Sequence, residues 1–262
     1  MQIDLPDGTI TASESGEGQP LVLLHSLLAD RGSFDQIVVP LARRFRVIVL
    51  DLPGFGGSSV IAGGLAACAD HMAAAVRRIV GQAQPILLGN GFGGFVALQM
   101  AIRHPDLAKR LVLTDSGAAF SEMGRQAFRN MARLAAADGL EAIIEVAMRR
   151  LFAPEFQAVN PDLMAGRRAA FLRTDPTAFQ SACDALATLD LRSDLGRVRV
   201  PTLVLVGEQD EATPLPMSEE LARLLPDARL VILPGCAHVP QMQNPGAFLA
   251  AIDDFLQSAI DA

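Results

Sequence analysis

Short apolar runs alternate with longer stretches of helical periodicity along most of the chain. The apolar runs that we interpret as buried strands are residues 21–24, 47–50, 86–88, 111–114, 202–206 and 229–233. Between them, apolar residues recur three or four positions apart, which predicts helices that include residues 34–43, 66–80 and 245–260. Two more runs, residues 3–5 and 9–13, flank Pro6-Asp7-Gly8 and predict an opening hairpin. This alternation predicts an α/β fold with a mostly parallel, doubly wound sheet and helices on both faces.

The pattern changes between residues 120 and 189. Ala, Leu, Met and Arg recur there at helical spacing, and no clear strand is visible before the sheet resumes near residue 202. We therefore expect a core domain made of residues 1–119 and 190–262, with an all-helical cap inserted at 120–189. A chain of 262 residues is long enough for one such folding unit.

A glycine-rich stretch joins the strand at residues 86–88 to the helix that follows. It reads Gly89-Asn90-Gly91-Phe92-Gly93-Gly94, and glycines at this point allow a sharp strand-to-helix turn and close packing. Two chemistries use this geometry. As G-x-S-x-G the stretch is a nucleophile elbow with Gly91 at the position of the serine, and as G-x-G-x-x-G it is a dinucleotide-binding loop.

Composition excludes several classes of function. The net charge of −7 and the absence of Trp and Tyr argue against a nucleic-acid-binding surface, and no apolar run approaches the length of a membrane span. Cys68, Cys183 and Cys236 are scattered and odd in number, so they predict neither a disulfide framework nor a metal site. No signal peptide is visible at the start of the chain. We expect a cytoplasmic protein that acts on a small molecule without a cofactor or metal, and homo-oligomer formation is left open.

The dinucleotide alternative has some support. The strand after the glycine unit ends in Asp115, where an acid could bind a ribose hydroxyl. Two strands of the parallel set precede this unit, however, and polar loops follow other strands that a dehydrogenase would not require. An NAD(P)-dependent oxidoreductase is therefore the less favoured alternative.

Polar residues gather after the predicted strands, where the ligands of such sheets bind. These strand-end positions are His25, Asp51, Gly91, Asp115, Asp210 and His238. The order of elbow, acid and histidine along the chain is the order used by α/β-hydrolases. This convergence favours a hydrolase.

Several motifs carry a resemblance to a known family. They are His25-Ser26-Leu27 (usually His-Gly-x), Asp51-x-Pro-Gly-Phe-Gly-x-Ser58, the elbow, Pro201-Thr-Leu-Val-Leu-Val-Gly-x-x-Asp210, and Gly235-x-x-His238 followed by Asn244-Pro245. With them the chain resembles the α/β-hydrolase superfamily along nearly its whole length. Residues 25–30 and 182–192 are most similar to the 3-oxoadipate enol-lactonase branch.

The resemblance implies roles for individual residues. His238 would be the general base, oriented by Asp210, and the backbone N–H groups of Leu27 and Phe92 would form the oxyanion hole. The substrate pocket would include His25, Ser26, Asn90 and Asp115.

Arg125, Arg129 and Arg133 recur every four residues within the predicted cap and share one helix face. A solvated face is the favoured interpretation, and contact with a substrate carboxylate, as in an enol-lactone, is the alternative.

Gly91 departs from the family, which has Ser, Cys or Asp at this position. We expect hydrolysis of a small ester, lactone or related carbonyl compound in which His238 activates water or the substrate directly. The alternatives are a catalytically disabled binder, either a natural pseudo-hydrolase or an engineered Ser→Gly variant, and a substitute nucleophile. Candidates for that nucleophile are Ser26, Ser116 and Cys236.

Overall fold

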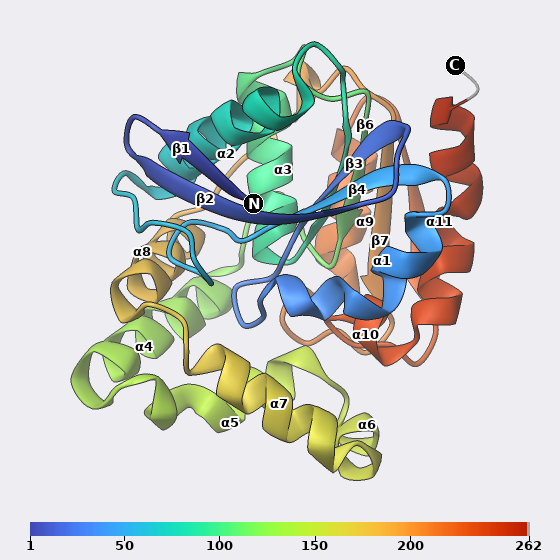
Figure 1. Cartoon of the computed structure of the whole chain (residues 1–262). Helices are drawn as coiled ribbons and strands as arrows, with labels where there is room; N and C mark the ends of the chain where they lie inside the picture. The colour runs from blue at the N-terminus through green and yellow to red at the C-terminus, as the bar shows by residue number, and fades with distance from the viewer. Residues whose placement is uncertain (261–262) are drawn as a thin grey trace.

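An eight-stranded sheet forms the centre of the molecule in a computed structural model that describes residues 1–260 (Figure 1). The strands are β1 (Gln2–Leu5), β2 (Gly8–Ser15), β3 (Gln19–Leu24), β4 (Phe45–Leu50), β5 (Ile86–Asn90), β6 (Arg110–Thr114), β7 (Thr202–Gly207) and β8 (Ala228–Leu233). Their order is β1-β2-β4-β3-β5-β6-β7-β8. The pairs from β4 to β8 are parallel, whereas β2 pairs antiparallel with both β1 and β4. The predicted fold class and the opening hairpin are confirmed.

The apolar runs of the sequence form strands that are buried on both faces. In β3, Leu21 and Leu23 belong to one hydrophobic core, and Val22 and Leu24 belong to the other. Successive side chains of a strand point to opposite faces, so a continuous apolar run supplies both cores at once. This two-sided burial is typical of parallel sheets covered by helices.

Helices cover both faces of the sheet (Figure 1). The core helices are α1 (Asp35–Leu41), α2 (Gly64–Val80), α3 (Phe92–Arg103), α9 (Leu215–Leu224), α10 (Pro240–Gln243) and α11 (Pro245–Ile260), with a 3₁₀ turn, η1 (Arg31–Phe34), before α1. α2, α3 and α9 pack into one hydrophobic core, whereas α1 and α11 pack into the other. No helix in the described part of the chain is both long and apolar enough to cross a membrane.

The segment from residue 120 to 189 is helical and lies below the sheet in the view of Figure 1. It contains α4 (Glu122–Asp138), η2 (Leu140–Ile143), α5 (Ile144–Leu151), α6 (Pro154–Val159), α7 (Pro161–Phe171) and α8 (Pro176–Ala187), and η3 (Arg192–Arg197) follows it. We call residues 120–189 the cap. Side chains cap the N-termini of α4 and α8. Ser121 accepts from the N–H of Gly124, and Asp175 accepts from two N–H groups of α8.

The two ends of the cap meet. Ala119 and Asp190 form an isolated antiparallel bridge, and the N–H of Leu191 donates to the carbonyl of Ala118 at 2.8 Å. The helical segment therefore leaves and re-enters the sheet layer at one place, next to the carboxyl end of β6.

Candidate active site

The glycine stretch forms a sharp turn between β5 and α3. Gly91 has φ +53° and ψ −118°, a conformation that favours glycine. A Cβ on Gly93 would overlap the carbonyl of Leu24, and one on Gly89 would overlap the backbone of Gly93. Close backbone packing, of Gly93 against β3 and of Gly89 against the start of α3, thus accounts for these two glycines.

Two loops at the carboxyl ends of β7 and β8 bring Asp210 and His238 together. The Nδ1 of His238 lies 2.9 Å from Oδ2 of Asp210, and both residues are only 5% exposed. The carboxylate also accepts from the N–H groups of Ala212 and Thr213 and from the Thr213 hydroxyl at 2.6 Å. Burial raises the pKa of Asp210, but His238 and the hydrogen bonds from His238 and Thr213 lower that pKa to about 2. Asp210 is therefore an ionised acceptor, which places the proton on Nδ1 of His238 and leaves Nε2 as an acceptor.

The free Nε2 of His238 faces Ser26, which lies in the loop after β3. The distance from the Ser26 Oγ to Nε2 is 3.1 Å, and Ser26 is buried. Since Nε2 accepts, the hydroxyl of Ser26 donates. The arrangement is a continuous chain of hydrogen bonds from Ser26 through His238 to Asp210.

Two backbone donors lie beside these groups. The N–H groups of Leu27 and Phe92 have no protein acceptor within residues 1–260, and both residues line the cavity around Gly91 and His238. Phe92 is the first residue of α3, so its N–H lacks an intrahelical partner and carries the positive end of the helix dipole. An anionic oxygen in this cavity could accept from both groups.

The family becomes clear when the chain is compared with known proteins. Residues 19–245 match the model of a family described as alpha/beta hydrolase fold. The chain belongs to the α/β-hydrolase family. It is 32% identical over 248 residues to a pimeloyl-[acyl-carrier protein] methyl ester esterase of Neisseria meningitidis, with 91% of this chain and 93% of the relative covered.

Solved structures give the same family. The enol-lactonase from Burkholderia xenovorans is similar with a TM-score of 0.92 and 25% identity, covering 98% of this chain and 100% of that one. A thermophilic esterase from Thermogutta terrifontis, whose structure is described as malate bound, has a TM-score of 0.89 and 29% identity, with 99% of each chain covered. The chain is an esterase-type hydrolase of the α/β-hydrolase family.

Three residues predicted for the substrate pocket, His25, Asn90 and Asp115, do not line the cavity. His25 is fully buried, with Nδ1 donating to the Ser26 carbonyl at 2.9 Å and Nε2 accepting from the Leu52 N–H at 3.1 Å. Burial lowers the pKa of His25, which suits this neutral pairing. His25 thus holds the loop that carries Ser26.

Asn90 holds the loop that carries His238. Its Nδ2 donates to the His238 carbonyl at 2.8 Å, and its Oδ1 accepts from Gln241 at 3.1 Å. Ser26 is the predicted pocket residue that does line the cavity.

Asp115 lies behind Asp210 and makes no hydrogen bond to His238. It has a left-handed φ of +50°, is fully buried, and accepts from the Gly207 N–H at 2.8 Å. Burial and the neighbouring charge of Asp210 raise the pKa of Asp115 well above its usual value. Their surroundings thus move the pKa values of the two carboxyl groups apart, downward for Asp210 and upward for Asp115.

Asp115, Asp210 and His238 have ligand atoms within 4.8 Å of one another, close enough to consider a metal. The Nδ1 of His238 and both oxygens of Asp210 already form hydrogen bonds within the protein. A cation would have to break the His238–Asp210 contact, so the arrangement fits a proton relay better than a metal site.

The catalytic cavity is small and mostly apolar, with a volume of about 30 Å³. Core loops supply its floor and the cap supplies its roof. Its lining residues are Ser26, Leu27, Leu28, Gly91, Phe92, Phe95, Phe120, Phe128, Arg150, Leu186, Ala212, Thr213 and His238. This space is enough for one or two water molecules, by an order-of-magnitude estimate.

Arg150 is the one charged cap residue in that lining, and it is not among the residues predicted for the site. Within residues 1–260 it forms no ion pair and donates no hydrogen bond, and its guanidinium lies 5.6 Å from the centre of the Phe128 ring. Burial lowers the pKa of Arg150. Arg150 lies three residues after buried Ala147 and so shares its face of α5, but the spacing alone does not show which face of the helix points inward.

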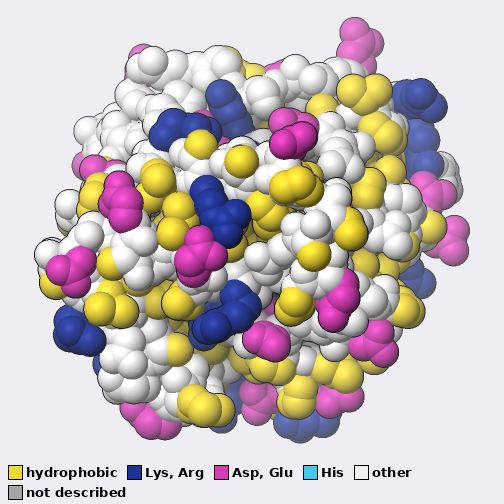
Figure 2. All heavy atoms as spheres, turned by 90° about the horizontal axis from the view of Figure 1, so that it is seen from below, with side chains coloured by type: hydrophobic (Ala, Val, Ile, Leu, Met, Phe, Trp, Pro, Cys, Tyr) yellow, Lys and Arg dark blue, Asp and Glu magenta, His cyan; other side chains and the backbone are white. Residues whose placement is uncertain are grey.

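The arginines that the sequence singled out lie elsewhere. Arg125 donates to the carbonyls of Phe120 and Leu189 near the ends of the cap, Arg129 pairs with Glu122 at 2.7 Å, and Arg133 is exposed. Basic and acidic side chains are interspersed with apolar ones on this side of the molecule (Figure 2). The solvated face describes Arg129 and Arg133, whereas Arg125 joins the two ends of the cap.

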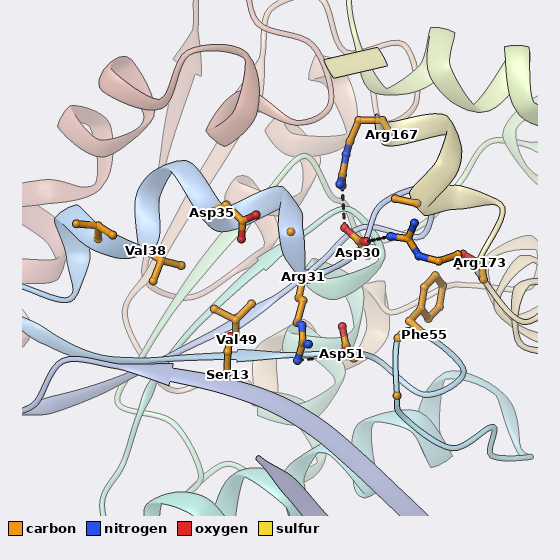
Figure 3. A pocket seen from close by; sticks show the side chains of 16 residues that line it. Ser13, Asp30, Arg31, Asp35, Val38, Val49, Asp51, Phe55, Arg167 and Arg173 are labelled. Atoms are coloured by element: carbon orange, nitrogen blue, oxygen red, sulfur yellow. Dashed lines mark hydrogen bonds and ion pairs between the residues drawn. The ribbon is translucent and has the colours of Figure 1, made fainter. Parts of the chain in front are cut away.

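A larger hollow of about 790 Å³ lies between η1, α1 and α7, and Figure 3 shows its side chains. Its charged side chains other than Asp35 pair with one another. Asp30 meets Arg167 at 2.7 Å and Arg173 at 3.5 Å, and Arg31 meets Asp51 at 3.4 Å. Neither His238 nor Gly91 lines this hollow. The smaller cavity, which both residues line, is therefore the candidate active site.

Proposed function

We propose that this protein hydrolyses small esters or lactones, with His238 as the general base. The observation that carries the proposal is the position of the Nε2 of His238. The ring is oriented by Asp210, its Nε2 accepts from the Ser26 hydroxyl, and His238 lines the same cavity as Leu27 and Phe92, whose N–H groups have no protein acceptor within residues 1–260. A base and two oxyanion donors around one small cavity are the parts that acyl transfer requires.

Each group has a defined task. Nε2 takes the proton from the attacking oxygen as that oxygen bonds to the carbonyl carbon. The carbonyl oxygen becomes an oxyanion and accepts from the N–H groups of Leu27 and Phe92. His238 then returns the proton to the leaving alcohol as its bond to carbon breaks, and Asp210 stabilises the imidazolium in between.

The relatives and Arg150 support a substrate class. The similar proteins are a methyl ester esterase, an enol-lactonase and an esterase described as malate bound. The Arg150 guanidinium is partly buried, lines the cavity and forms no ion pair within residues 1–260, so it is available to an anionic group of a substrate. We therefore expect the preferred ester or lactone to carry a carboxylate, positioned by Arg150.

A panel of p-nitrophenyl esters and small lactones, with and without a carboxylate, tests this function. The His238→Ala variant is expected to lose activity by about 10³-fold or more. His104→Ala is the matched control, because His104 pairs with Asp70 on the surface. Hydrolysis that survives His238→Ala, or no hydrolysis of any substrate, would contradict the proposal.

The glycine at position 91 is the observation that favours a second candidate, a non-catalytic binder of the same molecules. A binder would show calorimetric binding of an ester or lactone without turnover. It would also leave His238→Ala with unchanged affinity.

A further inference from the structure

Position 91 has no side chain, yet the space in front of it is filled. A Cβ built on Gly91 would lie 2.5 Å from the Oγ of Ser26, 3.0 Å from its Cβ, and 2.6 Å from the Nε2 of His238. The hydroxymethyl group of Ser26 therefore occupies the volume that an elbow side chain would need. We propose that Ser26 is the nucleophile of this hydrolase, and this inference rests on the proposed function.

The sequence places a serine in one of the two loops that meet here and none in the other. The loop after β3 reads His25-Ser26-Leu27, whereas the elbow has Gly91 at the nucleophile position. A serine at both positions would place two side chains in one volume.

Ser26 has the partners that an activated serine requires. Its Oγ donates to the Nε2 of His238 at 3.1 Å, and the Nδ1 of His238 donates to Asp210 at 2.9 Å. A nucleophile within hydrogen-bond reach of a base, with that base oriented by a third group, is the pattern of covalent catalysis. The Ser26 carbonyl accepts from the His25 ring and from the Ala29 N–H, which fixes the loop behind the hydroxyl.

The other candidate nucleophiles lack these contacts. The Ser116 hydroxyl is buried against Gly94 and has no partner within the described residues. Cys236 is buried, and burial raises the pKa of its thiol to about 11, so it remains protonated near neutral pH.

The reaction would proceed in two steps, acylation of Ser26 and hydrolysis of the resulting ester. The Ser26 Oγ bonds to the carbonyl carbon as its proton passes to Nε2, the oxyanion accepts from Leu27 and Phe92, and the leaving alcohol departs with the proton from His238. Water then attacks the ester on Ser26 and gives a proton to Nε2. That proton returns to Oγ as the acid leaves, so one water is consumed per ester bond.

A fluorophosphonate that modifies activated serines, with peptide mass spectrometry, tests the inference on the intact chain. One phosphonyl group is expected on wild type, on the peptide that contains Ser26. Labelling should disappear in Ser26→Ala, slow by at least about 100-fold in His238→Ala, and proceed at the wild-type rate in Ser116→Ala. Ser26→Ala should also lower kcat by about 10³-fold or more, with thermal unfolding measured to confirm that it folds.

The outcomes separate this inference from the proposed function. Wild-type hydrolysis that depends on His238, with no label on Ser26 and full activity in Ser26→Ala, overturns the nucleophile and leaves water as the attacking group. A wild-type protein that neither hydrolyses esters nor takes the label overturns both. Labelling of any other serine overturns the assignment of Ser26.

Discussion

A Cβ atom on Gly91 would lie 2.5 Å from the Oγ of Ser26. The two positions therefore compete for one volume in front of His238, and the chemistry of each depends on what stands at the other. Because Gly91 has no side chain, the Ser26 hydroxyl can reach the Nε2 of His238.

This competition predicts the effect of restoring the family residue. Gly91→Ser alone should displace Ser26 or His238, lower the free energy of unfolding by about 1–3 kcal/mol, and reduce kcat/KM, since φ at residue 91 is +53° and the space is taken. Gly91→Ser combined with Ser26→Gly should recover stability and activity relative to Gly91→Ser. Ester kinetics and urea unfolding of the three proteins measure this, and a large gain from Gly91→Ser alone would indicate a disabled hydrolase.

Asp210 determines which ring nitrogen of His238 carries the proton. Asp210→Asn should leave the fold intact but lower kcat by up to about 10⁴-fold, because an amide can favour the wrong tautomer. Asp194→Asn, at a surface pair with Arg197, is the control. Steady-state kinetics measure the loss, and a change below about tenfold would mean that another group orients His238.

Arg150 should select substrates by charge. Arg150→Met is expected to raise KM for carboxylate-bearing esters by about 10–100-fold, the size of a lost charged hydrogen bond, and to leave neutral esters nearly unchanged. Arg149→Met is the matched control, because Arg149 is exposed and does not line the catalytic cavity. Equal effects on charged and neutral esters would show that Arg150 only supports the cap.

Asp115 should make the stability depend on pH. Its folded pKa is raised by burial and by Asp210, so above about pH 4 the unfolded chain releases a proton that the folded chain retains. The free energy of unfolding then falls with rising pH, by at most about 1.4 kcal/mol per pH unit, until the folded pKa is passed. Asp115→Asn removes this contribution and suits the left-handed backbone at φ +50°. Denaturant unfolding at pH 5 and 8 should show a relative gain for Asp115→Asn that grows with pH, and a pH-independent difference would contradict the assignment.

The sequence could predict the sheet because its strands are buried on both faces and therefore read as uninterrupted apolar runs. The closing helix was predicted at residues 245–260, the bounds of α11. Helix starts were less clear, and α2 begins at Gly64, two residues before the predicted start, because glycine gives no helical signal. The lateral position of β2 beside β4 depends on long-range pairing that no local pattern encodes.

The candidate site divides in the same way. Asp210 and His238 could be located because polar residues that follow parallel strands converge at one edge of the sheet. The contact between Ser26 and His238 spans 212 residues, so only the folded chain reveals it. Arg150 was not predicted because its inward orientation depends on how α5 packs against the core. The regularly spaced Arg125 and Arg129 were considered as substrate contacts, but they do not line the cavity.

The bridge between Ala119 and Asp190 marks the place where the chain leaves the core for the cap and returns to it. The proposed base and oxyanion donors come from loops of the sheet, whereas α4, α5 and α8 supply cap residues that line the same cavity. Under the proposed function, substrate selection and bond cleavage are thus encoded in separable stretches of the sequence. Replacing the cap between residues 119 and 190 with the cap of a relative should change the substrate preference of this hydrolase and leave Asp210 and His238 in place.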